Sequence, residues 1–200
     1  MKEEVNLAKL YFHYGAMSSG KTAQLIGVAT NYEVQGKRVL IFSSSLDSRA
    51  EENTVSSRNG FTFPSLGFDR ETDLYSEIFS SMSLDLHCVL VDEAHFLSGD
   101  QVMQLSFVVD RLGIPVICFG LKNDFRNRLF EGTEHLLLYA DVLKEIKTVC
   151  WFCNRKATMN LRLAKGRPIY EGEQVLIGGT ESYLPVCRRC YSNPPLTKPP

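Results

Sequence analysis

The chain has 200 residues, of which 44% are hydrophobic and 22% are charged, and its formal net charge is −1. This length has room for one large domain, or for one domain with a small appendage. The near-neutral charge argues against a broad electrostatic surface for DNA or RNA, although it leaves room for a local basic patch. No apolar run reaches the length of a membrane span, and residues 1–5 lack the apolar core of a signal peptide. We therefore expect a cytoplasmic protein with no membrane partner.

Strand and helix patterns alternate along the chain up to about residue 147. Short apolar runs predict strands, and apolar residues at helical spacing predict helices. Near-continuous apolar strands alternating with helices are typical of an α/β fold, in which a parallel sheet carries helices on both faces. In chain order we predict a strand at 10–14, a helix at 22–32, a strand at 38–43, a mobile polar loop at 50–60, a helix at 74–83, a strand at 88–91, a helix at 98–112, and strands at 115–120 and 142–148.

A phosphate-binding pattern joins the first strand to the first helix. Its glycines let the backbone curl so that several N–H groups point at phosphate oxygens, and the helix presents its positive end to the anion. The lysine of this pattern reaches the β- and γ-phosphates, and the last hydroxyl can ligate Mg²⁺. We expect the lysine to be an exposed charge on the loop. The pattern G-x-x-x-x-G-K-[ST] is matched by Gly15, Ala16, Met17, Ser18, Ser19, Gly20, Lys21 and Thr22.

An acidic pair follows the predicted strand at 88–91. In a P-loop protein an acid at the end of an apolar strand holds Mg²⁺, so we expect Asp92 to share the ion with Thr22. Glu93 would then lie close to the γ-phosphate, where a carboxylate can act as a general base. Without the phosphate loop, a solvent-exposed acid pair would be the better interpretation.

The same segment offers a rival interpretation, because Asp92-Glu93-Ala94-His95 is the motif II string of DEAH-type helicases. Those motors clamp nucleic acid between two RecA-like domains, and 200 residues cannot supply two such domains and the cysteine-tied segment described next. A nucleic-acid-dependent ATPase module completed by a partner chain is therefore kept as the alternative function. A non-catalytic scaffold that binds nucleotide as a switch is a third.

The six cysteines fall into two classes. Cys88 and Cys118 lie inside apolar runs and are expected in the core. The other four form two C-x-x-C pairs, which in a cytosolic chain predict a tetrahedral zinc site rather than disulfides. Four thiolates leave no open position for catalysis, so this zinc would be structural and would close residues 154–186 at their base. The predicted zinc ligands are Cys150, Cys153, Cys187 and Cys190.

Taken together, these motifs closely resemble the zinc-containing, RecA-like thymidine kinase family. The resemblance covers residues 10–191, and the motifs occur in the family's order. It implies a RecA-like fold and transfer of the γ-phosphoryl group of ATP, with Mg²⁺, to the 5′-hydroxyl of thymidine and deoxyuridine. It also implies a zinc-tied lasso over the nucleoside and a homotetramer. Besides residues 15–22 and 92–96, it rests on residues 120–126, on Ile177-Gly178-Gly179 before Tyr183, and on Cys187-Arg188-Arg189-Cys190.

The resemblance implies three parts of the chain: an ATP-binding domain at 1–148, a zinc-binding lasso at 149–192 and a proline-rich tail at 193–200, which we expect to be disordered. It implies that Glu93 takes the proton of the 5′-hydroxyl and that Phe125 packs on the base. Arg49 is a weaker candidate for charge stabilisation. ATP would contact residues 15–22 together with Asp92, Glu93, Ala94 and His95. The nucleoside would contact Phe125, the lasso residues Gln174, Val175, Leu176, Ile177 and Gly178, and Tyr183.

One residue departs from the family's pattern, which most often has glutamine where this chain has His95. Histidine can still donate or accept a hydrogen bond, but its charge changes near neutral pH. The difference affects the expected pH dependence and leaves the family resemblance intact. A satisfied, partly buried histidine without a direct role is an equally good interpretation.

Overall fold

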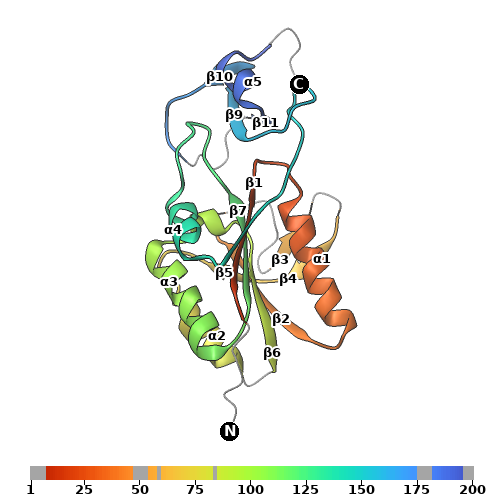
Figure 1. The fold of residues 1–200 in the computed structure, drawn as a ribbon, viewed down its shortest axis with the longest axis vertical. Coiled ribbons are helices and arrows are strands. Elements are labelled where there is room, and N and C mark those ends of the chain that lie inside the picture. The colour runs from red at the N-terminus through yellow and green to blue at the C-terminus, as the bar shows by residue number, and fades with distance from the viewer. Residues whose placement is uncertain (1–7, 47–53, 58–59, 83–84, 175–181, 196–200) are drawn as a thin grey trace.

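The computed structural model describes residues 8–46, 54–57, 60–82, 85–174 and 182–195. A six-stranded sheet lies at its centre, in the order β5-β2-β6-β7-β1-β8 (Figure 1). All neighbouring strands of this sheet run parallel, so the carboxyl ends of the strands meet at one edge. The strands are β1 (Leu10–Gly15), β2 (Arg38–Ser44), β5 (Leu66–Phe68), β6 (Leu86–Val91), β7 (Val116–Leu121) and β8 (Val142–Glu145).

Helices cover both faces of the sheet, which confirms the α/β prediction (Figure 1). One face carries α1 (Lys21–Val34), and the other carries α2 (Leu74–Ser81), α3 (Gly99–Phe107) and α4 (Glu131–Tyr139). Ser98 begins α3 through a capping box with Gln101, which satisfies two backbone N–H groups at the helix start. The predicted helix at 98–112 is α3 followed by a π-helical turn (Val108–Leu112). In the part of the chain that the structure describes, no helix is long and apolar enough to cross a membrane.

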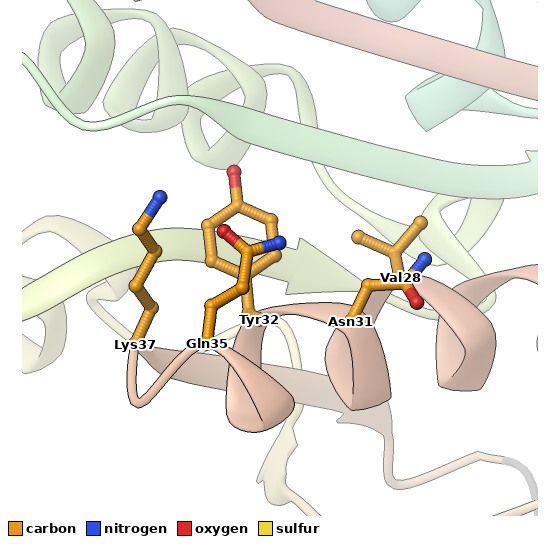
Figure 2. A pocket seen from close by; sticks show the side chains of 5 residues that line it. All are labelled: Val28, Asn31, Tyr32, Gln35 and Lys37. Carbon is orange, nitrogen blue, oxygen red and sulfur yellow. The ribbon is translucent and has the colours of Figure 1, made fainter.

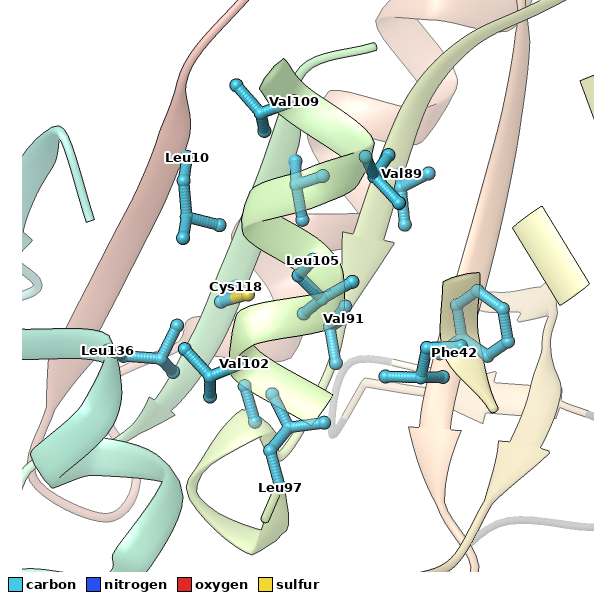
Figure 3. Packing of buried hydrophobic residues seen from close by; sticks show 14 of the residues in the cluster. Leu10, Phe42, Val89, Val91, Leu97, Val102, Leu105, Val109, Cys118 and Leu136 are labelled. Carbon is cyan, nitrogen blue, oxygen red and sulfur yellow. The ribbon is translucent and has the colours of Figure 1, made fainter. Parts of the chain in front are cut away.

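The largest core cluster lies between the sheet and the helices α2, α3 and α4 (Figure 3). Strand residues contribute alternate side chains to it, and α3 contributes residues at helical spacing. Cys88 and Cys118 are completely buried, as predicted for core thiols. The cluster includes Leu10, Phe12, Phe42, Val89, Val91, Leu97, Val102, Leu105, Val109, Cys118 and Leu136.

The predicted polar loop at 50–60 contains a strand and was wrong in that respect. Strand β3 (Thr54–Ser56) pairs antiparallel with β4 (Thr62–Pro64), which follows it. The physical reason is Val55, which is 2% exposed and packs in the core cluster under α1. The strands β4 and β5 and the helix α4 were not predicted from the sequence, and neither were the strands and the short helix that follow residue 158. The predicted disordered tail lies largely outside the described residues, which end at 195.

A second, smaller sheet lies beyond the carboxyl-terminal edge of the central sheet (Figure 1). It contains β10 (Arg167–Ile169), β9 (Met159–Ala164) and β11 (Ser182–Val186), in that order, and all its pairs are antiparallel. The short helix α5 (Arg188–Ser192) follows it. We call the described residues 159–174 and 182–192 the lid. Their small core packs around the paired cysteines.

Candidate active site

The phosphate loop runs from the end of β1 to the start of α1, as predicted. Gly20 precedes the helix with a φ of 81°, a left-handed conformation that glycine adopts without strain. Gly15 is required by a close approach, because a Cβ there would lie 2.5 Å from the carbonyl oxygen of Ile146. The buried Oγ of Ser19 has no hydrogen-bond partner among the described residues. An anion bound in the loop would supply the hydrogen-bond acceptor that the Ser19 hydroxyl lacks, so the loop is suited to binding an anion.

Lys21 is buried, and the expectation of an exposed charge on the loop was wrong. It is the first residue of α1 and is 7% exposed. Its Nζ donates a hydrogen bond of 3.0 Å to the carbonyl oxygen of Ala16. The side chain thus folds back across the phosphate loop, and its ammonium lies where an anion in the loop would meet it.

Thr22 and Asp92 meet across the carboxyl-terminal edge of the sheet. The Thr22 hydroxyl donates to Oδ2 of Asp92 at 2.9 Å, although the residues are 70 positions apart. Asp92 is 3% exposed, and its Oδ1 accepts the backbone N–H of Glu93 at 3.0 Å. Burial, followed by the neighbouring Glu93, raises the pKa of Asp92 to about 7. Mg²⁺ prefers oxygen ligands, and the Thr22 hydroxyl and the Asp92 carboxylate supply two oxygens that lie close together.

Glu93 has a strained backbone. Its φ of 49° and ψ of 37° are left-handed values that few residues other than glycine adopt. It precedes the 3₁₀ turn Ala94–Phe96 and is 9% exposed. Such strain persists where surrounding structure holds it, and it is found most often at functional sites. The left-handed backbone therefore places the Glu93 carboxylate where a continued regular strand would not place it.

His95 is buried next to Glu93. Its Nδ1 accepts the backbone N–H of Leu121 at 3.3 Å and lies 3.4 Å from Oε2 of Glu93. A neutral ring that accepts at Nδ1 carries its proton on Nε2. Phe96 and Phe130 pack against the ring, with centroid distances of 4.1 and 4.5 Å. These contacts describe a satisfied core histidine that also borders Glu93, so they are consistent with either interpretation of this residue.

Phe125 and Tyr183 come together between the β7–α4 loop and the lid. Their ring centroids are 6.3 Å apart at an interplanar angle of 69°. Arg162 of β9 lies over both rings, with its Cζ 4.6 Å from the Phe125 centroid and 5.8 Å from that of Tyr183. Arg162 is itself 3% exposed. The sequence analysis missed this arginine, and its position between two leucines in a strand gave little sign of burial.

Asn160 links the lid to the phosphate loop and was also missed. Its Oδ1 accepts the backbone N–H of Met17 at 2.8 Å. Its Nδ2 donates to the carbonyl oxygen of Asn123, also at 2.8 Å. Because the residue is 1% exposed, both bonds are shielded from water. The lid is therefore in direct contact with the phosphate loop.

The four paired cysteines form one cluster at the base of the lid. Their sulfur atoms all lie within 4.8 Å of one another, and two of the separations are 3.7 and 3.9 Å. A tetrahedral zinc with Zn–S bonds of about 2.3 Å would place its sulfurs about 3.8 Å apart. A hydrogen bond from the backbone of Cys190 lowers the pKa of Cys187 to about 7, while burial raises the pKa of Cys190 to about 12, so Cys187 loses its proton first. This cluster could hold a metal ion, and its chemistry suggests zinc.

A pocket beside the carboxyl-terminal half of α1, where side chains of the helix point toward the sheet, is separate from this site (Figure 2). Its volume is about 260 Å³. Burial raises the pKa of Tyr32 in this pocket to about 12. The pocket contains no residue of the phosphate loop or of the acidic pair. Its lining residues are Val28, Asn31, Tyr32, Gln35 and Lys37 (Figure 2).

Some predicted site residues lie outside the described part of the chain. They are Arg49 and the segment Val175, Leu176, Ile177 and Gly178. Gln174 is the last described residue before that segment, and its amide Nε2 lies 3.2 Å from Oδ2 of Asp124. Of the predicted site residues that are described, the structure brings three groups together. The first is the phosphate loop with Asp92 and Glu93, the second is Phe125 with Tyr183, and the third is the cluster of four paired cysteines.

Comparison with known proteins gives a consistent result. The family model "Thymidine kinase" matches residues 8–191. A thymidine kinase of Shouchella clausii is 52% identical over 192 residues, which cover 96% of this chain and all of that protein. A thymidine kinase of Lactiplantibacillus plantarum is 53% identical over 193 residues, again 96% of this chain and all of the relative. One of Listeria monocytogenes is 51% identical over 95% of this chain and its own full length.

A match of this extent includes the phosphate loop, the acidic pair, the aromatic pair and all four paired cysteines in one alignment. The chain belongs to the thymidine kinase family.

Proposed function

We propose that this protein transfers the γ-phosphoryl group of ATP to the 5′-hydroxyl of thymidine and of deoxyuridine. With thymidine the product is dTMP, so the enzyme would act in pyrimidine deoxynucleotide salvage. The observation that carries this proposal is the contact between Thr22 and Asp92 beside Glu93, under a lid that brings Tyr183 to Phe125. Family membership supplies the substrates, because the relatives above are named thymidine kinases.

The phosphate loop and the acidic pair would hold ATP. Backbone N–H groups of residues 15–22 and the Lys21 ammonium would bind the phosphates, with residues 92–95 alongside. Thr22 and Asp92 would hold Mg²⁺, since their oxygens fit this ion. Bound there, Mg²⁺ would neutralise charge on the phosphates. Glu93 would accept the proton of the 5′-hydroxyl and orient its oxygen for in-line attack.

The lid would bind the nucleoside and exclude water. Phe125 and Tyr183 would cover the apolar parts of the base, and residues 174–178 would pair with its polar edge through the backbone. Water must be kept from the γ-phosphate, because otherwise the enzyme would hydrolyse ATP. We retain the division into an ATP-binding domain at 1–148, a lid domain at 149–192 and a tail at 193–200 as part of this proposal.

The oligomeric state, the cellular location and the partners are also part of this proposal. A homotetramer is proposed by family resemblance. A cytoplasmic location is proposed because ATP and reduced cysteine thiols occur together there. We propose no nucleic-acid partner, since the net charge of −1 gives no basic excess.

Purified protein should phosphorylate thymidine in the presence of ATP and Mg²⁺, and single-stranded DNA should not stimulate ATP hydrolysis. The measurement is product formation by chromatography, with thymidine, with DNA, and with neither. Strong stimulation by DNA in the absence of nucleoside would favour the ATPase module. Tight nucleotide binding without turnover would favour the nucleotide switch.

Zinc is proposed as the structural metal of the four-cysteine cluster. Cys153→Ser should lower zinc content and melting temperature together, because an incomplete site loses both a ligand and a cross-link. Cys118→Ala is the matched control: it removes a buried thiol from the main core, so it should change stability without changing zinc content. Metal analysis and thermal unfolding measure both quantities. Wild-type protein without zinc and with all four thiols free would contradict the proposal.

Mg²⁺ should raise the melting temperature more at pH 8 than at pH 6. The pKa of Asp92 is about 7 in the metal-free fold and about 4 in an unfolded chain. The folded state therefore holds an extra proton between these values, and the free energy of unfolding falls as the pH rises through them. A cation at Asp92 favours the carboxylate and offsets that loss above pH 7.

Thermal unfolding with and without Mg²⁺ at both pH values tests this expectation. Asp92→Asn is the control, since its side chain does not titrate, and any remaining Mg²⁺ effect should be equal at the two pH values. An effect of Mg²⁺ on the wild-type protein that is also equal at pH 6 and pH 8 would show that Asp92 does not hold the ion.

A further inference from the structure

The lid contacts the loop between β7 and α4 at several points. We call residues 122–130 the docking loop. Polar contacts join it to lid residues that are 37 to 66 positions away in the sequence. The lid therefore rests on one short loop as well as on the phosphate loop. The contacts are Asn160 Nδ2 to Asn123 O at 2.8 Å, Tyr191 Oη to Phe125 O at 2.6 Å, Arg126 Nη1 to Gly172 O at 3.0 Å, and Gln174 Nε2 to Asp124 Oδ2 at 3.2 Å and to Leu129 O at 3.5 Å.

One carboxylate organises this loop. The side chain of Asp124 is 1% exposed. Its Oδ1 accepts the backbone N–H groups of Arg126 and Arg128 at 2.9 and 2.8 Å. Its Oδ2 accepts Nε of Arg126 at 2.9 Å and Nε2 of Gln174 at 3.2 Å. Hydrogen bonds to an ionised acceptor are about twice as strong as neutral ones, so Asp124 fixes the shape of the loop and holds the lid with the same group.

The position of Asp124 connects this contact to the nucleoside. The next residue is Phe125, whose ring faces Tyr183 and Arg162 of the lid. If the lid shifts against the docking loop, the spacing of these aromatic rings changes. The phosphate loop contacts the lid at Asn160, which also bonds Asn123 of the docking loop, whereas the Asp124–Gln174 contact involves the docking loop alone.

We propose that the pair Asp124–Gln174 is a positioning contact that docks the lid and thereby sets the affinity for the nucleoside. The inference rests on the function proposed above. Arg126 supports the pair, because it bonds Asp124 through Nε and the lid backbone at Gly172 through Nη1. Neither Asp124 nor Gln174 needs to touch the reacting atoms, so their loss should appear in the KM for thymidine much more than in kcat.

Gln174→Glu tests the contact by placing a second carboxylate against Asp124. The KM for thymidine should rise roughly tenfold, since the buried Asp124 and the half-buried Gln174 would lose their hydrogen bond and gain a like-charge repulsion. The KM for ATP should change little. In the double variant Asp124→Asn with Gln174→Glu, the new amide can donate to the new carboxylate but gives up the bond from Nε of Arg126, so the part of the KM increase that comes from like-charge repulsion should be reversed.

Two further variants make the result interpretable. Glu171→Gln changes the charge of an exposed residue three positions away in the sequence by one unit in the opposite direction, and it should leave the KM for thymidine unaltered. Gln174→Ala removes the donor without adding a charge, and it replaces Gln174→Glu if that variant folds poorly. A KM unchanged in Gln174→Glu and Gln174→Ala, or raised but not recovered in the double variant, would overturn the proposal.

Hydrogen–deuterium exchange without substrates separates this inference from the proposed function. In Gln174→Glu, peptides that cover residues 122–130 and 182–191 should exchange faster, and the double variant should restore their protection. If these changes occur but wild-type protein does not phosphorylate thymidine, the proposed function is wrong and the docking contact stands. If exchange is unaltered in Gln174→Glu, the docking contact is wrong.

Discussion

Lys21→Met should lower kcat for phosphoryl transfer about 10³-fold, which corresponds to roughly 4 kcal/mol of lost transition-state stabilisation. Phosphoryl transfer needs positioning and charge neutralisation rather than covalent chemistry, so a lysine ammonium at the phosphates contributes mainly in the transition state. Methionine keeps most of the length of the side chain, which matters because Lys21 is buried. The change therefore isolates the charge and its hydrogen bond to Ala16.

The stability of this variant should change little. The wild-type ammonium has been removed from water, and replacing it by an apolar side chain removes the cost of that burial together with the hydrogen bond to Ala16 and the attraction to Asp92, so the opposing contributions largely offset. Steady-state kinetics and thermal unfolding are measured on the same preparation of each protein. Lys37→Met is the control, because it makes the same replacement in the pocket beside α1, away from the phosphate loop. A native-like melt with near-normal turnover in Lys21→Met would count against the phosphate-loop assignment.

Contiguous motifs allowed much of this site to be predicted from the sequence. The phosphate loop needs its glycines, lysine and hydroxyl within eight positions, and the acidic pair needs only a preceding strand. A parallel sheet then brings Thr22 and Asp92 to one edge. The cysteine pairs are equally local, since each pair comes from one tight turn. Motifs of this kind can therefore be found in a sequence without knowledge of the tertiary structure.

Contacts between distant segments could not be predicted in the same way. Asn160 and Arg162 alternate with leucines in β9, a pattern that normally indicates one buried and one exposed face. In the structure both faces are buried, because the lid core covers one and the docking and phosphate loops cover the other. Lys21 was misjudged for a related reason, since its burial depends on how the side chain folds back over the loop.

Glu93→Gln should lower kcat by about 10²–10⁴-fold, the usual range for a general base. Glutamine keeps the size and the hydrogen-bonding capacity of the side chain but removes the basic oxygen. Glutamine also keeps the Cβ, so the strained left-handed backbone at this position is not altered by the change. Binding of ATP and thymidine should change little, because the ground-state contacts remain.

The comparison with Asp92→Asn separates the roles of the two acids. Loss of Asp92 should weaken the dependence on Mg²⁺ as well as the rate, because its carboxylate would hold the ion with Thr22. Loss of Glu93 should lower the rate at every Mg²⁺ concentration. Steady-state kcat and nucleoside affinity are to be measured for both variants across a Mg²⁺ titration.

The outcome depends on which step limits turnover. If product release limits kcat, a slower chemical step would be partly hidden, so single-turnover rates are needed beside the steady-state values. His95 lies 3.4 Å from Oε2 of Glu93, so Glu93→Gln also changes the surroundings of this ring, whereas Asp92→Asn leaves that contact in place. If Glu93→Gln keeps most of the wild-type single-turnover rate, the general-base role is wrong. The proton of the 5′-hydroxyl must then leave by another route, for example to a phosphate oxygen of ATP.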